Sequence, residues 1–145
     1  MNRDSKIILQ AFRQKTLDAI FLVEASLERT GVFEADKKYT PVEREPYDAL
    51  CDRFVRAVET GIKFFKSYEI RMFGESSETL RDLMLRMEKI DMISSLDIWF
   101  RMRDVRNRIV HDYLPEEIQA MYHDIKQPFA NELIRLKSKL ADIIS

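Results

Sequence analysis

Residues that end helices are scarce in this chain, which has 3 glycines and 4 prolines among its 145 residues. Glycine and proline supply most turns and helix ends, so the chain has few places at which it can change direction. Hydrophobic residues make up 46% of the sequence, which is enough to build a core, and strong helix formers such as leucine, glutamate and lysine are frequent. We therefore predict a single domain over residues 1–145 that consists of long helices.

Apolar residues recur every three or four positions in five segments of the sequence, as they do in helices that bury one face. The expected helices cover residues 5–29, 47–72, 80–90, 96–113 and 115–143. Gly61 lies inside the second of them and indicates a close helix crossing. Short connections favour antiparallel neighbours, so we predict an all-α fold, an up-and-down bundle of four or five antiparallel helices.

The few turn residues predict where these helices end. Gly31 and Gly74 each follow an expected helix and are predicted to form left-handed C-caps. Residues 31–46 contain two prolines and several charges, and are predicted to form an unusually long loop that is either mobile or covers a site. Ser94 is the predicted N-cap of the fourth helix, and Pro128 is expected to kink the last helix about one turn earlier.

The charges of the chain nearly cancel, since 24 lysines and arginines stand against 25 aspartates and glutamates. We therefore expect no DNA binding, and any site for anions must be local. The single cysteine, Cys51, excludes an internal disulfide and a cysteine-rich zinc site, and is expected in the core. No apolar run approaches the ~18 residues of a membrane span and no secretory signal follows Met1, so we expect a cytoplasmic protein without membrane contact. Glycine-rich phosphate loops, metal-binding pairs and a nucleophile elbow are missing, so we expect no metal and no cofactor.

Candidate chemistry concentrates in residues 103–113, which read R-D-V-R-N-R-I-V-H-D-Y. Arginine is a permanent cation that binds phosphate through two parallel hydrogen bonds, and histidine has the side-chain pKa nearest neutrality. Arg106 and His111 are thus candidate catalytic residues for phosphodiester chemistry. The candidate phosphate ligands beside them are Arg103, Asn107 and Arg108. Simpler roles stay open, since the arginines could form a solvated face and the histidine could only cap the helix.

Arg106 and His111 do not converge on a regular helix, because five residues separate them by ~140° around the axis, so either the helix end distorts or a second copy supplies the missing group. A second copy of the chain across a two-fold axis supplies the missing group most simply, and places two arginines and two histidines in one cleft. The apolar Leu96 and Phe100 lie on the same side of the helix as His111, which makes this face the expected dimer interface.

The string R-N-R-I-V-H-D-Y, which begins at Arg106, resembles the R-x4-H-x-Y signature of the HEPN superfamily, and in particular of HepT-like toxins. The first arginine, His111 and Tyr113 match the three signature positions, and Asn107 matches the usual polar residue after the arginine. The resemblance is strongest from residue 95 to residue 140. The segment F-V-R-A-V-E, which begins at Phe54, is also weakly similar to nucleotidyltransferase substrate-binding proteins, a sister group on the same fold.

This resemblance implies a helical bundle that forms a homodimer. The resemblance also implies a toxin that cleaves RNA as a metal-independent endoribonuclease, with Arg106 and His111 as catalytic residues. It also implies a partner, a minimal nucleotidyltransferase that acts as antitoxin and can place AMP on Tyr113. The competing interpretation is a non-catalytic adaptor or substrate-binding subunit for the nucleotidyltransferase, in which the same motif only holds the interface. A third interpretation is a purely structural helical dimer.

Overall fold

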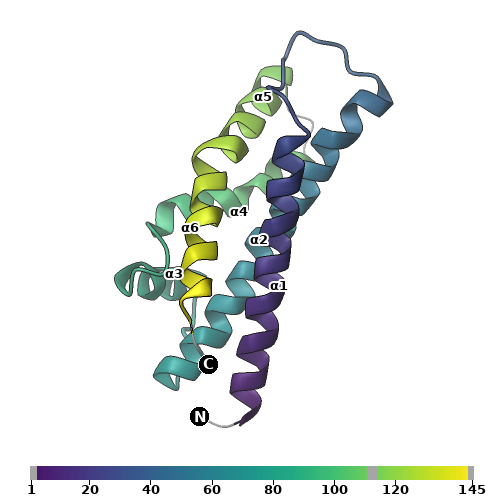
Figure 1. Ribbon diagram of the computed structural model, residues 1–145. Coiled ribbons are helices and arrows are strands. Elements are labelled where there is room, and N and C mark those ends of the chain that lie inside the picture. The colour runs from purple at the N-terminus through teal and green to yellow at the C-terminus, as the bar shows by residue number, and fades with distance from the viewer. Residues whose placement is uncertain (1–2, 111–113, 144–145) are drawn as a thin grey trace.

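The computed structural model describes residues 3–110 and 114–143, and within them the chain consists of helices and loops with no strand (Figure 1). The expected all-α helical bundle is confirmed. In chain order the elements are α1 (Arg3–Glu28), α2 (Pro41–Phe73), α3 (Leu80–Lys89), α4 (Leu96–Val110), α5 (Pro115–Asp124), the π-helical turn η1 (Ile125–Phe129) and α6 (Ala130–Ala141).

Two long antiparallel helices, α1 and α2, form the spine of the bundle and share its largest helix interface (Figure 1). The segment from α5 through η1 to α6 runs along the bundle beside them, and α3 projects from one side. A contiguous core of buried side chains connects α1, α2, α4 and α6. The helix that carries the motif, α4, crosses the bundle and packs mainly against α2.

The start of α2 differs from the expectation, because the helix begins at Pro41 and not after Pro46. The loop predicted over residues 31–46 is therefore wrong in its second part. Thr40 caps the helix: its hydroxyl oxygen accepts a hydrogen bond from the Glu43 amide at 3.2 Å, and its own amide donates to the Glu43 carboxylate at 3.1 Å. Pro41 fits the first turn because no backbone N–H is needed there.

The two glycines predicted to end helices behave differently. Gly74 is left-handed, with a φ of 70°, and its amide donates to the Ile70 carbonyl at 3.0 Å, so the predicted C-cap of α2 is confirmed. Gly31 is not left-handed, and that prediction is wrong. After α1, the ammonium of Lys126 in η1 donates to the carbonyls of Thr30 and Gly31 at 2.7 and 2.6 Å, so another element satisfies them. Burial lowers the pKa of Lys126.

The break predicted from Pro128 is confirmed. Gln127, which precedes the proline, leaves helical geometry with φ −165° and ψ 120° inside η1. A residue before proline is disfavoured in the helical region, which explains the position of the break. α5 and α6 are therefore separate helices joined by η1.

A buried carboxylate, Glu132 of α6, organises the start of α4. It accepts hydrogen bonds from the Trp99 indole at 2.8 Å and from the hydroxyl and amide of Ser94 at 2.6 and 3.0 Å. Ser94 is therefore not the N-cap that the sequence predicts, and the hydroxyl of Ser95 accepts the Ile98 amide at 3.2 Å instead. These bonds offset the cost of burying the carboxylate and join α6 to α4 and to the preceding loop.

Among the described residues, Trp99 has the largest fully buried side chain, and it fixes the crossing of α4 over α2. Its ring packs edge-on against Phe65, with 4.9 Å between the ring centroids. A Cβ atom at Gly61 would lie 3.3 Å from the same ring, which is tighter than an ordinary contact. The close crossing predicted at Gly61 is thus confirmed, and its partner is the tryptophan.

Replacing Glu132 with alanine would leave the buried indole N–H of Trp99 without an acceptor and would also remove the acceptor of the hydroxyl and amide of Ser94, which is exposed. We expect the free energy of unfolding to fall by about 3 kcal/mol or more, because each hydrogen bond to a charged group contributes about 1.5–3 kcal/mol. Chemical denaturation followed by the fluorescence of Trp99, the only tryptophan, measures this loss. Glu24→Ala is the control, since its surface ion pair with Lys137 at 3.0 Å should contribute less than ~1 kcal/mol. Equal losses in the two variants would contradict the role assigned to Glu132.

Candidate functional site

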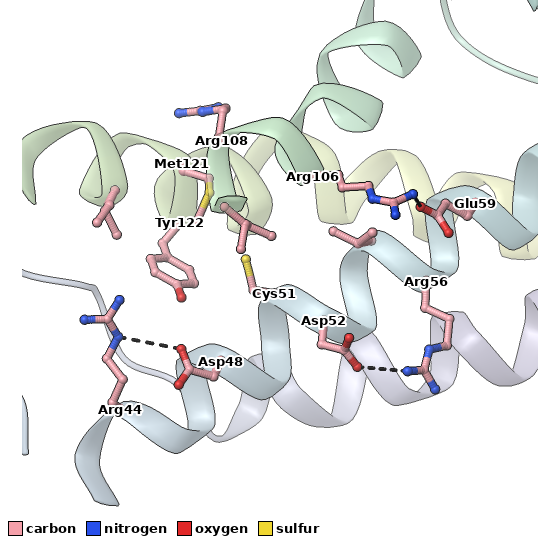
Figure 2. Close-up of a pocket in the computed structure, with 13 residues that line it drawn as sticks. Arg44, Asp48, Cys51, Asp52, Arg56, Glu59, Arg106, Arg108, Met121 and Tyr122 are labelled. Atoms are coloured by element: carbon pink, nitrogen blue, oxygen red, sulfur yellow. Dashed lines mark hydrogen bonds and ion pairs between the residues drawn. The ribbon is translucent and has the colours of Figure 1, made fainter. Parts of the chain in front are cut away.

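The described part of the motif lies on the last turns of α4. Arg106 is exposed, and its guanidinium donates to the Glu59 carboxylate of α2 at 2.7 Å (Figure 2). Arg106 follows Trp99 by seven residues, so both side chains leave α4 within ~20° of each other and face α2. His111 and Tyr113 lie outside the described residues, so the catalytic and AMP-acceptor roles expected of them stay predictions.

Two cavities meet at the ion pair between Arg106 and Glu59, and both residues line both cavities. The first, here called the arginine pocket, has a volume of about 560 Å³ and lies between α2, α4 and α5. The second, here called the lysine groove, has a volume of about 570 Å³ and lies between α2 and α4. Both volumes are in the range of small-ligand sites.

Every arginine that lines the arginine pocket is held by a carboxylate of the same chain. The pairs, with N–O distances from 2.7 to 3.6 Å, are Arg44–Asp48, Arg56–Asp52, Arg106–Glu59 and Arg108–Asp124. Figure 2 shows the first three of them along the side of the pocket that α2 forms. The positive charge of this pocket is therefore largely compensated, and an anionic ligand would have to compete with the carboxylates.

The floor of the arginine pocket is mainly apolar and includes Cys51 and Tyr122. Burial raises the pKa of the Cys51 thiol from 9.0 to about 12 and also raises the pKa of the Tyr122 hydroxyl. Both groups therefore stay protonated at neutral pH and supply neither a thiolate nor a phenolate nucleophile. The core position predicted for Cys51 is confirmed.

The lysine groove has a different charge pattern. Lys63 and Lys66 line it from α2, and Arg103 lines it from α4. None of these three side chains has an ion-pair partner among the residues that the structure describes. Asn107, next to them on α4, donates to the Asp104 carboxylate at 3.1 Å. The groove therefore presents cations without ion-pair partners beside Arg106, together with the carboxylates of Glu59 and Asp104, which also line it.

The apolar side chains predicted for a dimer interface are placed differently from the expectation. Leu96 and Phe100 are half-buried and pack against the protein's own core, and Phe100 also lines the lysine groove. The more exposed apolar side chains near the motif are Ile109 and Leu114, with exposed fractions of 43% and 64%. The available apolar surface thus lies at the end of α4 and the start of α5.

The structure distributes the predicted phosphate ligands over the two cavities. Arg103 and Asn107 line the lysine groove with Arg106, whereas Arg108 lines only the arginine pocket. The sequence prediction missed Glu59, which holds Arg106, and the two lysines of the groove. Their spacing of three and four residues signals one exposed face of α2, but it gives no sign that α4 lies opposite.

Metal ligands do not gather in the described residues: no three histidine, cysteine, aspartate or glutamate side chains there could hold a metal ion together. The described histidine, His123, is exposed on α5. Within residues 3–110 and 114–143, no helix is long and apolar enough to cross a membrane.

The fold and its two cavities define a helical bundle with a candidate anion site between α2 and α4. Residues 17–142 match the model of a family described as nucleotidyltransferase substrate binding protein like. The chain therefore belongs to this family, which is part of the HEPN-like group. Comparisons with curated proteins and with solved structures gave no match. The resemblance to nucleotidyltransferase substrate-binding proteins is confirmed, while the narrower HepT-like assignment stays a prediction.

The raised pKa of Cys51 predicts a thiol that reacts slowly. At about pH 8, iodoacetamide should modify the folded protein at least about 100-fold more slowly than the urea-unfolded chain, because only the thiolate reacts. The same shift has a consequence for stability: it favours the folded state below pH 9.0, and this contribution is lost as the pH rises toward about 12. Equal modification rates in the folded and unfolded protein, measured by mass spectrometry, would contradict a raised pKa of the Cys51 thiol.

Proposed function

We propose that this protein is a metal-independent endoribonuclease, a toxin whose partner is a minimal nucleotidyltransferase that acts as antitoxin. The observation that carries the proposal is the position of Arg106: the first arginine of the R-x4-H-x-Y string is exposed at the junction of two cavities. Membership of the family supports the partner, because the family name implies association with a nucleotidyltransferase.

Arg106 is available to a phosphate even though it is ion-paired. The side chains of Arg106 and Glu59 are 69% and 46% exposed, and an exposed ion pair contributes only about 0–1 kcal/mol. A phosphate that accepts two parallel hydrogen bonds from the guanidinium forms a stronger, charge-assisted contact. Substrate can therefore displace Glu59 from Arg106 at little cost.

The proposed reaction is a transesterification within the RNA. The ribose 2′-oxygen attacks the adjacent phosphorus, the O2′–P bond forms, the P–O5′ bond breaks, and His111 accepts the proton of the 2′-hydroxyl. A second, protonated histidine donates a proton to the leaving 5′-oxygen. In this proposal Arg106 stabilises the charge that gathers on the non-bridging oxygens, and Arg103 and Asn107, which line the lysine groove beside it, hold a neighbouring phosphate.

This scheme requires a homodimer, because each chain has one histidine in the motif. A two-fold axis that passes the end of α4 would bring two copies of Arg106 and His111 to one cleft. The exposed apolar side chains of Ile109 and Leu114 supply surface for such a contact. A sedimentation experiment that finds only monomers at micromolar concentration would exclude this arrangement.

Arg106→Ala and His111→Ala should each abolish RNA cleavage and toxicity, and a chelator should have no effect on the wild-type protein. If both histidines of a dimer act in one cleft, mixed dimers are inactive as well. Equal amounts of wild-type and His111→Ala chains, refolded together, should then retain about a quarter of the activity, whereas independent sites would retain about half. Lys6→Ala is the matched control for mixing, since this exposed residue lies outside both cavities. Cleavage of RNA by either purified variant would overturn the mechanism, and so would loss of cleavage by the wild-type protein in the presence of EDTA.

Tyr113 is the proposed acceptor of AMP from the partner transferase. The added phosphate and nucleoside would bring negative charge and bulk next to the motif and compete with RNA for its arginines. Tyr113→Phe should therefore keep its nuclease activity but escape silencing by the transferase with ATP and Mg²⁺. Mass spectrometry locates the adduct, and a label confined to another residue would refute this role.

A second candidate function is a non-catalytic subunit that presents substrate to the nucleotidyltransferase. The arginine pocket favours this function. Carboxylates of the same chain pair with every arginine that lines the pocket, so a strong phosphate site is not preformed there. The two functions differ in a simple assay. An adaptor would show no cleavage of RNA by the isolated protein and would raise the affinity of the transferase for its substrate.

A further inference from the structure

A row of charged side chains follows the exposed face of α2 and borders both cavities. Its members, spaced three or four residues apart, are Asp48, Asp52, Arg56, Glu59, Lys63 and Lys66. Such spacing places side chains on one face of a helix, so we call this row the charged ridge. All six side chains are exposed. The first four border the arginine pocket and carry three carboxylates, of which Glu59 also borders the lysine groove, whereas the last two border only the lysine groove and are both cations.

The sign of the charged ridge changes between Glu59 and Lys63. Before that point each carboxylate is paired with an arginine, so this half of the ridge offers no free cation. After it, Lys63 and Lys66 have no ion-pair partner in the described part of the chain, and neither has Arg103 across the groove. A polyanion that reaches Arg106 therefore finds these three cations on the lysine side, where the Asp104 carboxylate also lines the groove, and only ion-paired charges on the other side.

The floor of the lysine groove adds an apolar surface to these cations. Val58 and Ile62 contribute from α2, and Phe100 and Met102 contribute from α4. Phe100 is half-buried, so one part of its ring remains open to a ligand. Proteins that bind single-stranded nucleic acid combine a positively charged groove for the backbone with aromatic side chains on which bases stack.

We propose that the lysine groove holds the backbone of single-stranded RNA on one side of the phosphate bound at Arg106, with Lys63, Lys66 and Arg103 as its phosphate ligands. This inference rests on the proposed function, since it extends the same site. It gives the site a direction: the strand continues from Arg106 along the groove, because the ion-paired half of the charged ridge offers no free cation toward the arginine pocket.

The test is RNA binding as a function of salt, measured by fluorescence anisotropy with a labelled oligouridylate in a His111→Ala background. The slope of log K against log salt is negative, and each lost phosphate contact to a single strand reduces its magnitude by about 0.7, so Lys63→Ala/Lys66→Ala should make the slope less steep by about 1.4. An oligoadenylate should lose affinity to the same extent, because backbone contacts carry no sequence information. Lys6→Ala/Lys89→Ala is the matched control, which removes two exposed lysines outside both cavities and should leave the slope unchanged.

The outcomes separate this inference from the proposed function. An unchanged slope in the Lys63→Ala/Lys66→Ala variant, with the wild-type protein still cleaving RNA, would overturn the groove assignment alone. Lysine-dependent binding without any cleavage by the wild-type protein would support the groove and overturn the ribonuclease. If the double variant binds RNA normally but loses the nucleotidyltransferase in a pull-down, the groove is a docking site for an acidic protein and the inference is wrong.

Discussion

The position of Trp99 determines in which direction α4 presents the side chain of Arg106. The Trp99 indole donates to Glu132 of α6 and its ring lies against Gly61 and Phe65 of α2, so two neighbouring helices define the rotation of α4 about its own axis. Arg106 comes almost two turns later on the same face and is therefore aimed at α2. A contact deep in the core thus sets the direction of an exposed arginine.

The protein uses its carboxylates in two ways. Glu69 and Glu132 are buried and collect donors from nearby loops: Glu69 accepts the amide and hydroxyl of Ser77, and Glu132 accepts those of Ser94. Glu59 is exposed and holds Arg106 through a single ion pair. Removing Glu132 would leave the buried Trp99 indole without an acceptor, whereas breaking an exposed pair leaves both partners in contact with water. The first kind of contact maintains the fold, and the second kind can yield to a ligand.

The sequence predicted the helices well where local chemistry decides them. Gly74 ends α2 and Pro128 breaks the last helix because the backbone preferences of these residues act over a few positions. The prediction was wrong where a residue distant in sequence provides the hydrogen bond. Lys126 donates to the carbonyls after α1 in place of a cap at Gly31, and Glu132 accepts the Ser94 hydroxyl that was expected to cap α4. The same limit applies to the site. Arg106 was found from its motif, but its partner Glu59 lies 47 positions away, and helical spacing contains no information on how α2 and α4 cross.

The charged ridge of α2 and the helix crossing at Trp99 differ in how a substitution affects the fold. The side chains of the ridge are exposed and make no part of the core, so a change of sign at one of them leaves the packing of the bundle intact. Substitutions at the ridge should therefore cost little stability, while Trp99, Gly61 and Glu132 are coupled physically by the crossing that they share. The charge beside the two cavities can therefore be altered through a few point mutations, without passing through a poorly folded intermediate.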